Sequence, residues 1–303
     1  MKRNAARSGL QRVINKLSLR SFPLLRACLA EFCGTLILIL LGCGVMAQVM
    51  LGNHGRNAHG GFFSVGLGWG MAVTVGVFFS GVNGSGHINP AITLAFACIG
   101  KLPFRRVIWY ILSQIAGSFV GSLCVYVVYR EKLLEYVESK DAGKHLVETT
   151  GGIFVTNPGA SHWTCLVDQV MSTALLAAGV LAMTDPKGWK MPKWIEPLYV
   201  GFLIYTLVGC FALNCGAAMN PARDLGPRLM ILMLGWGGNA FSAGNYFFWI
   251  PIVGPVIGAI LGSVLYELTT GIHMDKPERT RNDPSKSVEN HLLENQNSIE
   301  LLP

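Results

Sequence analysis

The sequence predicts an all-α membrane protein with six transmembrane helices, two re-entrant half-helices and an inverted 3+3 repeat. The 303-residue chain is 51% hydrophobic and only 14% charged, which is more apolar than an ordinary soluble domain. Six apolar windows approach or reach the length of about 20 residues that crosses a bilayer. Two shorter apolar stretches each begin with Asn-Pro-Ala. One apolar window alone can be a buried core helix, but six together favour a membrane protein.

The six windows divide the chain into one membrane domain and two polar ends. We expect a basic tail over residues 1–26, the membrane domain over 27–270 and a polar tail over 271–303. The first apolar run is longer than that of a typical signal peptide, so we do not expect cleavage. The expected spans are 27–49, 62–80, 107–129, 166–183, 197–213 and 246–268.

Lysine and arginine gather on one predicted side of the membrane. The first tail contains seven of them and no acidic residue before Glu31, and others follow the second and fourth windows. Basic loops mark the cytoplasmic side, so both chain ends are predicted to be cytoplasmic. This placement accounts for the net charge of +7 without a nucleic-acid partner. The residues are Lys2, Arg3, Arg7, Arg12, Lys16, Arg20 and Arg26, then Lys101, Arg105 and Arg106, then Lys187, Lys190 and Lys193.

Nothing in the sequence favours an enzyme. The eight cysteines include no CxxC pair, so a disulfide framework or a zinc site is not expected. The chain has no nucleotide-binding loop and no spaced triad of catalytic side chains. We therefore predict no enzymatic activity, no metal site and no cofactor.

The two short stretches indicate a duplication with inverted topology. They read "GSGHINPAITLAFACIG" and "NCGAAMNPARDLGPRLMIL", around Asn89-Pro90-Ala91 and Asn220-Pro221-Ala222. A helix of about 12 residues rises only about 18 Å, roughly half a membrane. Three spans precede the chain midpoint and three follow it, and an odd number of spans per repeat inverts the second copy. The half-helices should therefore enter from opposite faces and meet at the midplane.

A second internal similarity supports the duplication. "AEFCGT" opens the first span with Glu31 and Thr35, and "VDQVMST" opens the fourth with Gln169 and Thr173. Both pairs have i, i+4 spacing, which places their polar side chains on one helix face.

The Asn-Pro pairs predict helix starts that face an aqueous path. Asparagine is a favoured N-cap, and proline is favoured at the first helical position. One such pair is merely a good helix start, but two inverted pairs in apolar surroundings indicate a site. We expect the asparagine amides to donate into a lumen. Extended backbone at membrane depth must line a cavity or lie within protein, so the preceding residues should present carbonyl acceptors: Ser85, Gly86 and His87, and Gly216, Ala217 and Ala218.

Such a lining suits small uncharged permeants. Each helix N-terminus carries roughly half a positive charge, which opposes cations and protons. An ion channel or coupled transporter remains an alternative, because transporters also use inverted repeats with broken helices. A cation path would need carboxylates facing it, whereas Asp224 adjoins Arg223. A purely structural, junction-forming role is a third alternative.

The order of four motifs resembles a known family. "AEFCGT", "SGHINPA", "MNPARDLGP" and "GWGGNAFSAGN" are similar to the motifs of aquaglyceroporins, the glycerol-conducting branch of the aquaporin or major intrinsic protein family. The branch markers would be Asp224, Arg228, Pro251 and Ile252. The resemblance implies a passive channel in the plasma membrane for water, glycerol, related small polyols or urea, which excludes protons and ions. It also implies a homotetramer and makes 27–270 an aquaporin-like channel domain.

The resemblance also implies a selectivity constriction, with two departures from the family pattern. The expected residues are Trp69, Gly209, Ala217 and Arg223. At Ala217 glycerol channels usually have phenylalanine or tyrosine, so we expect a wider opening. The usual glycine would fall at Val208, and choosing Gly209 instead requires a loop that is one residue shorter.

Overall fold

The computed structural model describes residues 9, 11–52, 59–140, 149–189, 191–236 and 239–274. Most of the predicted tail over 271–303 therefore lies outside the described residues. The start of the predicted tail over 1–26 and Lys190 also lie outside them.

Six helices are long and apolar enough to cross a membrane, in the part of the chain that the structure describes. They confirm the predicted number of spans, and the chain is a multi-pass membrane protein. The spans are α2 (Pro23–Leu51), α3 (Phe62–Gly81), α5 (Phe104–Ser139), α7 (His162–Thr184), α8 (Glu196–Cys215) and α11 (Ile250–Thr269).

Shorter helices connect and complete the spans. The two half-helices are α4 (Pro90–Cys98) and α9 (Pro221–Ile231). The remaining elements are η2 (Gly151–Ile153), η3 (Leu232–Trp236), α10 (Asn239–Tyr246), η4 (Phe247–Trp249) and η5 (Gly271–His273).

Three predicted boundaries are wrong for local reasons. Helix α2 begins at Pro23, inside the predicted tail, because proline fits the first helical turn. Helix α5 continues to Ser139, ten residues beyond its window, because 130–139 are polar yet rich in good helix formers. The α-helix of the last span begins at Ile250 and not at 246, because Tyr246 has a φ of 61°, which breaks the helix, and Phe247–Trp249 form the 3-10 turn η4.

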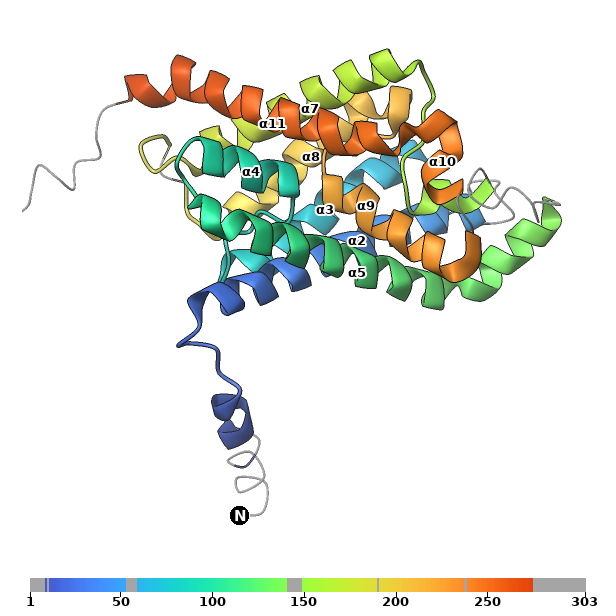
Figure 1. Cartoon of the computed structure of the whole chain (residues 1–303), viewed down its shortest axis with the longest axis horizontal. Coiled ribbons are helices and arrows are strands. Elements are labelled where there is room, and N and C mark those ends of the chain that lie inside the picture. The colour runs from blue at the N-terminus through green and yellow to red at the C-terminus, as the bar shows by residue number, and fades with distance from the viewer. Residues whose placement is uncertain are drawn as a thin grey trace, which may run out of the picture.

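The half-helices lie between two layers of spans. Figure 1 shows α2 and α5 on one side of α4 and α9, with α7 and α11 on the other. In the same view α4 lies toward the left end of the bundle and α9 toward the right, as expected for entry from opposite faces. The start of α2 and the end of α11 share the left end.

Close glycine contacts hold equivalent helix pairs together in the two halves. A Cβ atom added to Gly117 on α5 would lie 2.2 Å from the Phe32 carbonyl oxygen of α2. Likewise, a Cβ added to Gly258 on α11 would lie 2.3 Å from the Val170 carbonyl oxygen of α7. Small residues let helix backbones approach closely where lipid supplies no hydrophobic drive for association. The pairs α2–α5 and α7–α11 therefore correspond in the inverted repeat.

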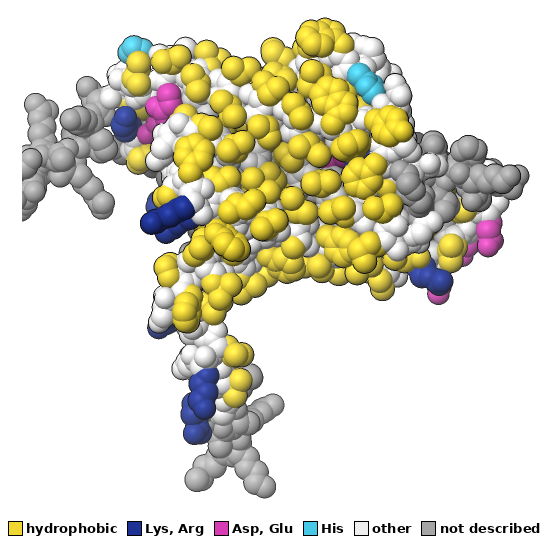
Figure 2. All heavy atoms as spheres, in the orientation of Figure 1, with side chains coloured by type: hydrophobic (Ala, Val, Ile, Leu, Met, Phe, Trp, Pro, Cys, Tyr) yellow, Lys and Arg dark blue, Asp and Glu magenta, His cyan; other side chains and the backbone are white. Residues whose placement is uncertain are grey.

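The outer surface of the bundle suits hydrocarbon. Figure 2 shows hydrophobic side chains over most of the visible bundle, with charged side chains mainly toward its two ends. Phe78, Leu112, Val128, Met171 and Leu261 are among the exposed large apolar residues. So much exposed apolar surface marks an interaction site on a soluble protein, and here it faces the lipid.

The glycine packing can be tested by overfilling it. A Cβ at Gly262 would lie 2.0 Å from the Ala174 carbonyl oxygen, so Gly262→Leu should push α11 away from α7. We expect it to lower the free energy of unfolding by about 1–3 kcal/mol or more, measured as a fall in melting temperature of the purified protein. Gly209→Leu is the matched control, because nothing lies within 4 Å of its added Cβ. Equal melting temperatures of the two variants would contradict the close packing.

Candidate pore

A cavity of about 1160 Å³ runs alongside both half-helices, past the point where they meet, and is lined by residues from both ends of the bundle. Its wall includes Ser85 and Trp194 toward the end where the chain starts, and Phe62 and Asn157 toward the other end. The sides away from the half-helices are apolar. They are formed by residues such as Leu38, Val73, Leu176 and Ile204.

Each half-helix begins at a side-chain cap. The Asn89 side-chain oxygen accepts from the Ala91 N–H at 2.9 Å, and that of Asn220 accepts from the Ala222 N–H at 3.0 Å. A proline occupies the first turn in both. The side-chain oxygen thus satisfies N–H groups that have no partner within the helix. The caps are those expected from the two Asn-Pro pairs.

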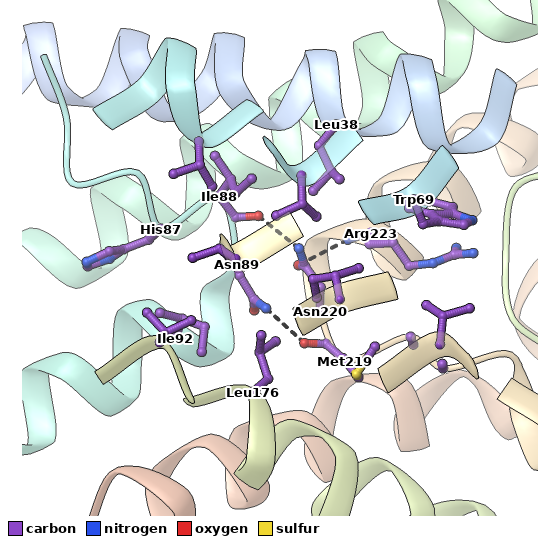
Figure 3. A pocket seen from close by; sticks show the side chains of 18 of the residues that line it. Leu38, Trp69, His87, Ile88, Asn89, Ile92, Leu176, Met219, Asn220 and Arg223 are labelled. Carbon is purple, nitrogen blue, oxygen red and sulfur yellow. Dashed lines mark hydrogen bonds between the residues drawn. The ribbon is translucent and has the colours of Figure 1, made fainter. Parts of the chain in front are cut away.

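The two asparagine amides also join the half-helices to each other. Asn89 Nδ2 donates to the Met219 carbonyl oxygen and Asn220 Nδ2 donates to the Ile88 carbonyl oxygen, both at 2.8 Å. Figure 3 shows these two crossed bonds where the segments meet. The sequence had suggested that both amides simply point into a lumen. Instead, one N–H of each is used across the contact. An amide nitrogen carries two hydrogens, so each asparagine keeps a second donor, and both line the cavity.

The backbone before each cap takes unusual conformations. Ile88, Ala217 and Met219 have φ values of 42°, 46° and 49°, each costing of order 1–3 kcal/mol for a residue with a Cβ. Gly86 and Gly216 are also left-handed, at 66° and 82°, without that cost. The twisted backbone lies against the cavity, as expected for the residues predicted to present carbonyl oxygens: Ser85, Gly86, His87, Gly216, Ala217 and Ala218 all line it.

Buried polar side chains hold this backbone in place. The Glu31 carboxylate accepts from the backbone N–H groups of His87 at 3.0 Å and Ile88 at 2.7 Å. In the second half, Gln169 Oε1 accepts from the Met219 N–H at 2.9 Å. The repeated motifs "AEFCGT" and "VDQVMST" thus supply the two anchors. The spacing of the motifs indicated a shared helix face, but the segment each anchor holds was not visible in the sequence.

The predicted constriction residues come together, with one exception. Arg223 is buried, donates from Nη1 to the Phe154 carbonyl oxygen at 2.8 Å, and lies over the Trp69 ring at 4.5 Å from its centroid. Ala217 and Val208 complete the cavity wall here. Gly209 is the exception. It is exposed and is not among the residues lining the cavity.

The choice of Gly209 over Val208 is therefore corrected. Successive residues of an α-helix point about 100° apart, so moving one position along α8 turns the side chain from the cavity toward the outer surface. Val208, buried against the cavity, takes the place assigned to Gly209. The shorter loop that this choice required is not needed.

Asp224 pairs with Arg228 and not with its neighbour Arg223. Asp224 and Arg228 are fully buried and form an ion pair in which Arg228 Nε donates to Asp224 Oδ2. Asp224 Oδ1 accepts from the Thr156 N–H at 2.7 Å, and Arg228 Nη2 donates to the Thr156 carbonyl oxygen at 2.6 Å. Thr156 lies two residues after Phe154, whose carbonyl binds Arg223. The ion pair thus positions the loop that holds Arg223, and no sequence motif had singled out that loop.

Several predicted residues lie behind the cavity wall. They are absent from its lining and are instead buried or partly buried at helix starts: Pro90, Ala91, Pro221, Ala222, Pro251 and Ile252. Pro251 occupies the first turn of α11.

A bundle with a through-going cavity and two half-helices meeting inside it is the architecture of a membrane channel. The profile of the family described as Major intrinsic protein matches residues 18–266. The chain is 38% identical to aquaporin-9 of Homo sapiens, over 90% of each chain, and 37% identical to aquaglyceroporin-3 of Trypanosoma brucei brucei, over 79% of this chain and 77% of that protein. The X-ray structure of the aquaglyceroporin from Plasmodium falciparum is similar, with a TM-score of 0.72, 26% identity and coverage of 81% of this chain and 96% of that one. This chain therefore belongs to the major intrinsic protein family.

Cysteine substitution can distinguish the two faces of α8. The thiol of Val208→Cys should face the cavity and react with a small water-soluble methanethiosulfonate, whereas that of Gly209→Cys should face lipid and stay unmodified. Mass spectrometry of the peptide containing the substitution reads out both. Faster labelling at position 209 than at 208 would restore the original assignment.

Removing one partner of the buried ion pair should be costly. Asp224→Ala leaves Arg228 as an unpaired buried charge, which costs about 3–5 kcal/mol, seen as a large fall in melting temperature. The control is Glu135→Ala, which breaks the exposed pair with Lys132 and should change stability little. An equally small effect at Asp224 would show that the buried pair does not hold the loop.

Proposed function

We propose that this protein is a passive transmembrane channel for water, glycerol and other small uncharged solutes. The observation that carries the proposal is the meeting of two helix N-termini inside one cavity, with the amides of Asn89 and Asn220 at the junction. Membership of a family of channels points away from an enzyme. Relatives named aquaporin and aquaglyceroporin support the same class of permeant.

The wall chemistry fits solutes that carry hydroxyl groups. Arg223, Asn89 and Asn220 offer donors, and the twisted backbone at Gly86 and Gly216 offers carbonyl acceptors. A hydroxyl group can replace its hydrogen bonds to water with hydrogen bonds to these groups at little cost in free energy. The apolar residues on the other sides of the cavity can contact the carbon chain of a polyol. Removing those carbon atoms from water has no free-energy cost, because their hydration is unfavourable.

The same arrangement opposes charged species. The two half-helices point their N-termini at the junction, each worth roughly half a positive charge, and Arg223 adds a full one. A water molecule that accepts from both asparagine amides has no lone pair left for a third donor, so it cannot relay a proton between its neighbours. Electrostatic barriers from an arginine or from half-helix N-termini are described for aquaporin-type pores.

The placement of the carboxylates argues against a cation path or a coupled transporter. Glu31 is fully buried and binds backbone N–H groups, and Asp224 is fully buried and binds Arg228. Neither belongs to the cavity lining. The carboxylate among the described lining residues is that of Glu196. It lies near one end of the cavity, where Lys193 also lines the wall.

Ala217 is proposed to widen the constriction. A methyl group stands where glycerol channels commonly have an aromatic ring, beside Trp69, Val208 and Arg223. We infer that solutes longer than glycerol also pass, and that urea is among the permeants.

The setting in the cell follows from the family and the distribution of charge. We propose a homotetramer with one pore per subunit in the plasma membrane, with both chain ends cytoplasmic. The basic N-terminal segment and the end of α11 lie at the same end of the bundle, which agrees with the positive-inside rule.

Reconstituted vesicles test the function directly. In an inward glycerol gradient, stopped-flow light scattering should show faster swelling than in empty vesicles, while an enclosed pH-sensitive dye reports little proton leak. Water flux without glycerol flux would defeat the glycerol assignment, and a rapid proton leak would defeat the exclusion argument.

The variant Ala217→Tyr serves as a matched comparison in the same vesicles. An added ring should reduce the flux of polyols longer than glycerol more than the flux of water. Equal reduction of all solutes would count against Ala217 as the residue that sets the width.

A further inference from the structure

The chain before α2 forms a short amphipathic segment that the pore does not use. Residue 9 and residues 11–16 are helical, and the Leu17 N–H donates to the Val13 carbonyl oxygen at 3.2 Å. Val13, Ile14 and Leu17 share one helix face by their spacing. They are 55%, 50% and 73% exposed. Within the described part of the chain, no element covers this apolar face.

The other face is polar and positively charged. Gln11 Nε2 donates to Asn15 Oδ1 at 3.3 Å along it. Arg12 and Lys16 are exposed on this face, Arg20 is exposed in the turn after the helix, and the sequence has no acidic residue before Glu31. A short helix with an apolar face opposite a basic one is typical of segments that lie in a membrane surface.

The position of the segment brings it to that surface. Leu17 is six residues before Pro23, where the first span begins, and the large apolar residues Phe22 and Leu25 continue the exposed surface into α2. Figure 1 shows the segment running across the direction of the spans instead of extending α2. In Figure 2 its dark blue side chains lie on the left and its hydrophobic ones on the right, the side toward which the apolar bundle extends.

We propose that residues 11–22 are a lipid-binding anchor for the leaflet at this end of the bundle. Val13, Ile14 and Leu17 insert below the headgroups, and Arg12, Lys16 and Arg20 bind anionic phospholipids. Each basic residue near an anionic surface strengthens binding by about fivefold. A second copy of the chain is a poorer occupant, because its own segment has the same positive charge.

Hydrogen exchange of the full-length protein tests the anchor. The protein is placed in nanodiscs of phosphatidylcholine alone or of phosphatidylcholine with phosphatidylserine, and exchange at 11–22 is followed by mass spectrometry. We expect exchange to be slower by about tenfold in the anionic discs. High salt should reverse this gain, because it screens exposed charges.

Three variants separate charge, insertion and background. Arg12→Gln/Lys16→Gln/Arg20→Gln should remove the gain from anionic lipid, and Val13→Ser/Ile14→Ser/Leu17→Ser should remove protection in both kinds of disc. Arg130→Gln/Lys132→Gln/Lys140→Gln makes the same charge change at the far end of α5 and should leave the exchange of residues 11–22 unchanged. Equal exchange in both kinds of disc would overturn the proposal. Protection that rises with the number of protein copies per disc, and not with the fraction of phosphatidylserine, would overturn it too, by showing that a neighbouring copy covers the segment.

Discussion

The pore depends on two crossed hydrogen bonds between the half-helices. Each asparagine caps its own helix through oxygen and binds the other segment through nitrogen. The carbonyl oxygens that accept these bonds belong to Ile88 and Met219, two residues with strained positive φ. The bonds therefore stabilise the strained conformation of the backbone that lines the cavity. Without these two bonds each half-helix would keep its own cap, but the asparagine amide N–H groups and the carbonyl oxygens of Ile88 and Met219 would lose their partners at membrane depth. Each such loss costs several kcal/mol.

The surrounding bundle holds the junction at fixed height. Glycine contacts bring α5 onto α2 and α11 onto α7 so closely that added side chains would strike backbone. Helix α2 contains the anchor Glu31 and helix α7 contains the anchor Gln169. Their side chains accept hydrogen bonds from the backbone before the half-helices. The position of each polar anchor thus depends on the close packing of its helix pair. If a helix pair separates, its anchor moves away from the N–H groups that it binds.

The two halves share a frame but differ in chemistry. The first half is anchored by a carboxylate that accepts from two backbone N–H groups, and the second by a neutral amide that accepts from one. The second half also contains the buried pair of Asp224 and Arg228, which forms hydrogen bonds with the loop around Thr156. That loop also supplies the Phe154 carbonyl oxygen that accepts from Arg223, so the Arg223 guanidinium is held both by its own helix and by a loop. Both halves thus contribute to the junction, whereas Arg223, the loop that holds it and the pair of Asp224 and Arg228 lie on one side of it.

The sequence by itself determined the number of spans, the inverted repeat and the caps at Asn89 and Asn220, because apolar length and cap chemistry are local properties. It did not determine which side chains meet. One position along α8 turns a residue by about 100°, so Val208 rather than Gly209 reaches the cavity only because the packing of α8 fixes its rotation. The Phe154 carbonyl and the crossed amide bonds also join segments far apart in the chain. Such contacts depend on how distant segments are placed relative to one another, and only the tertiary structure decides that.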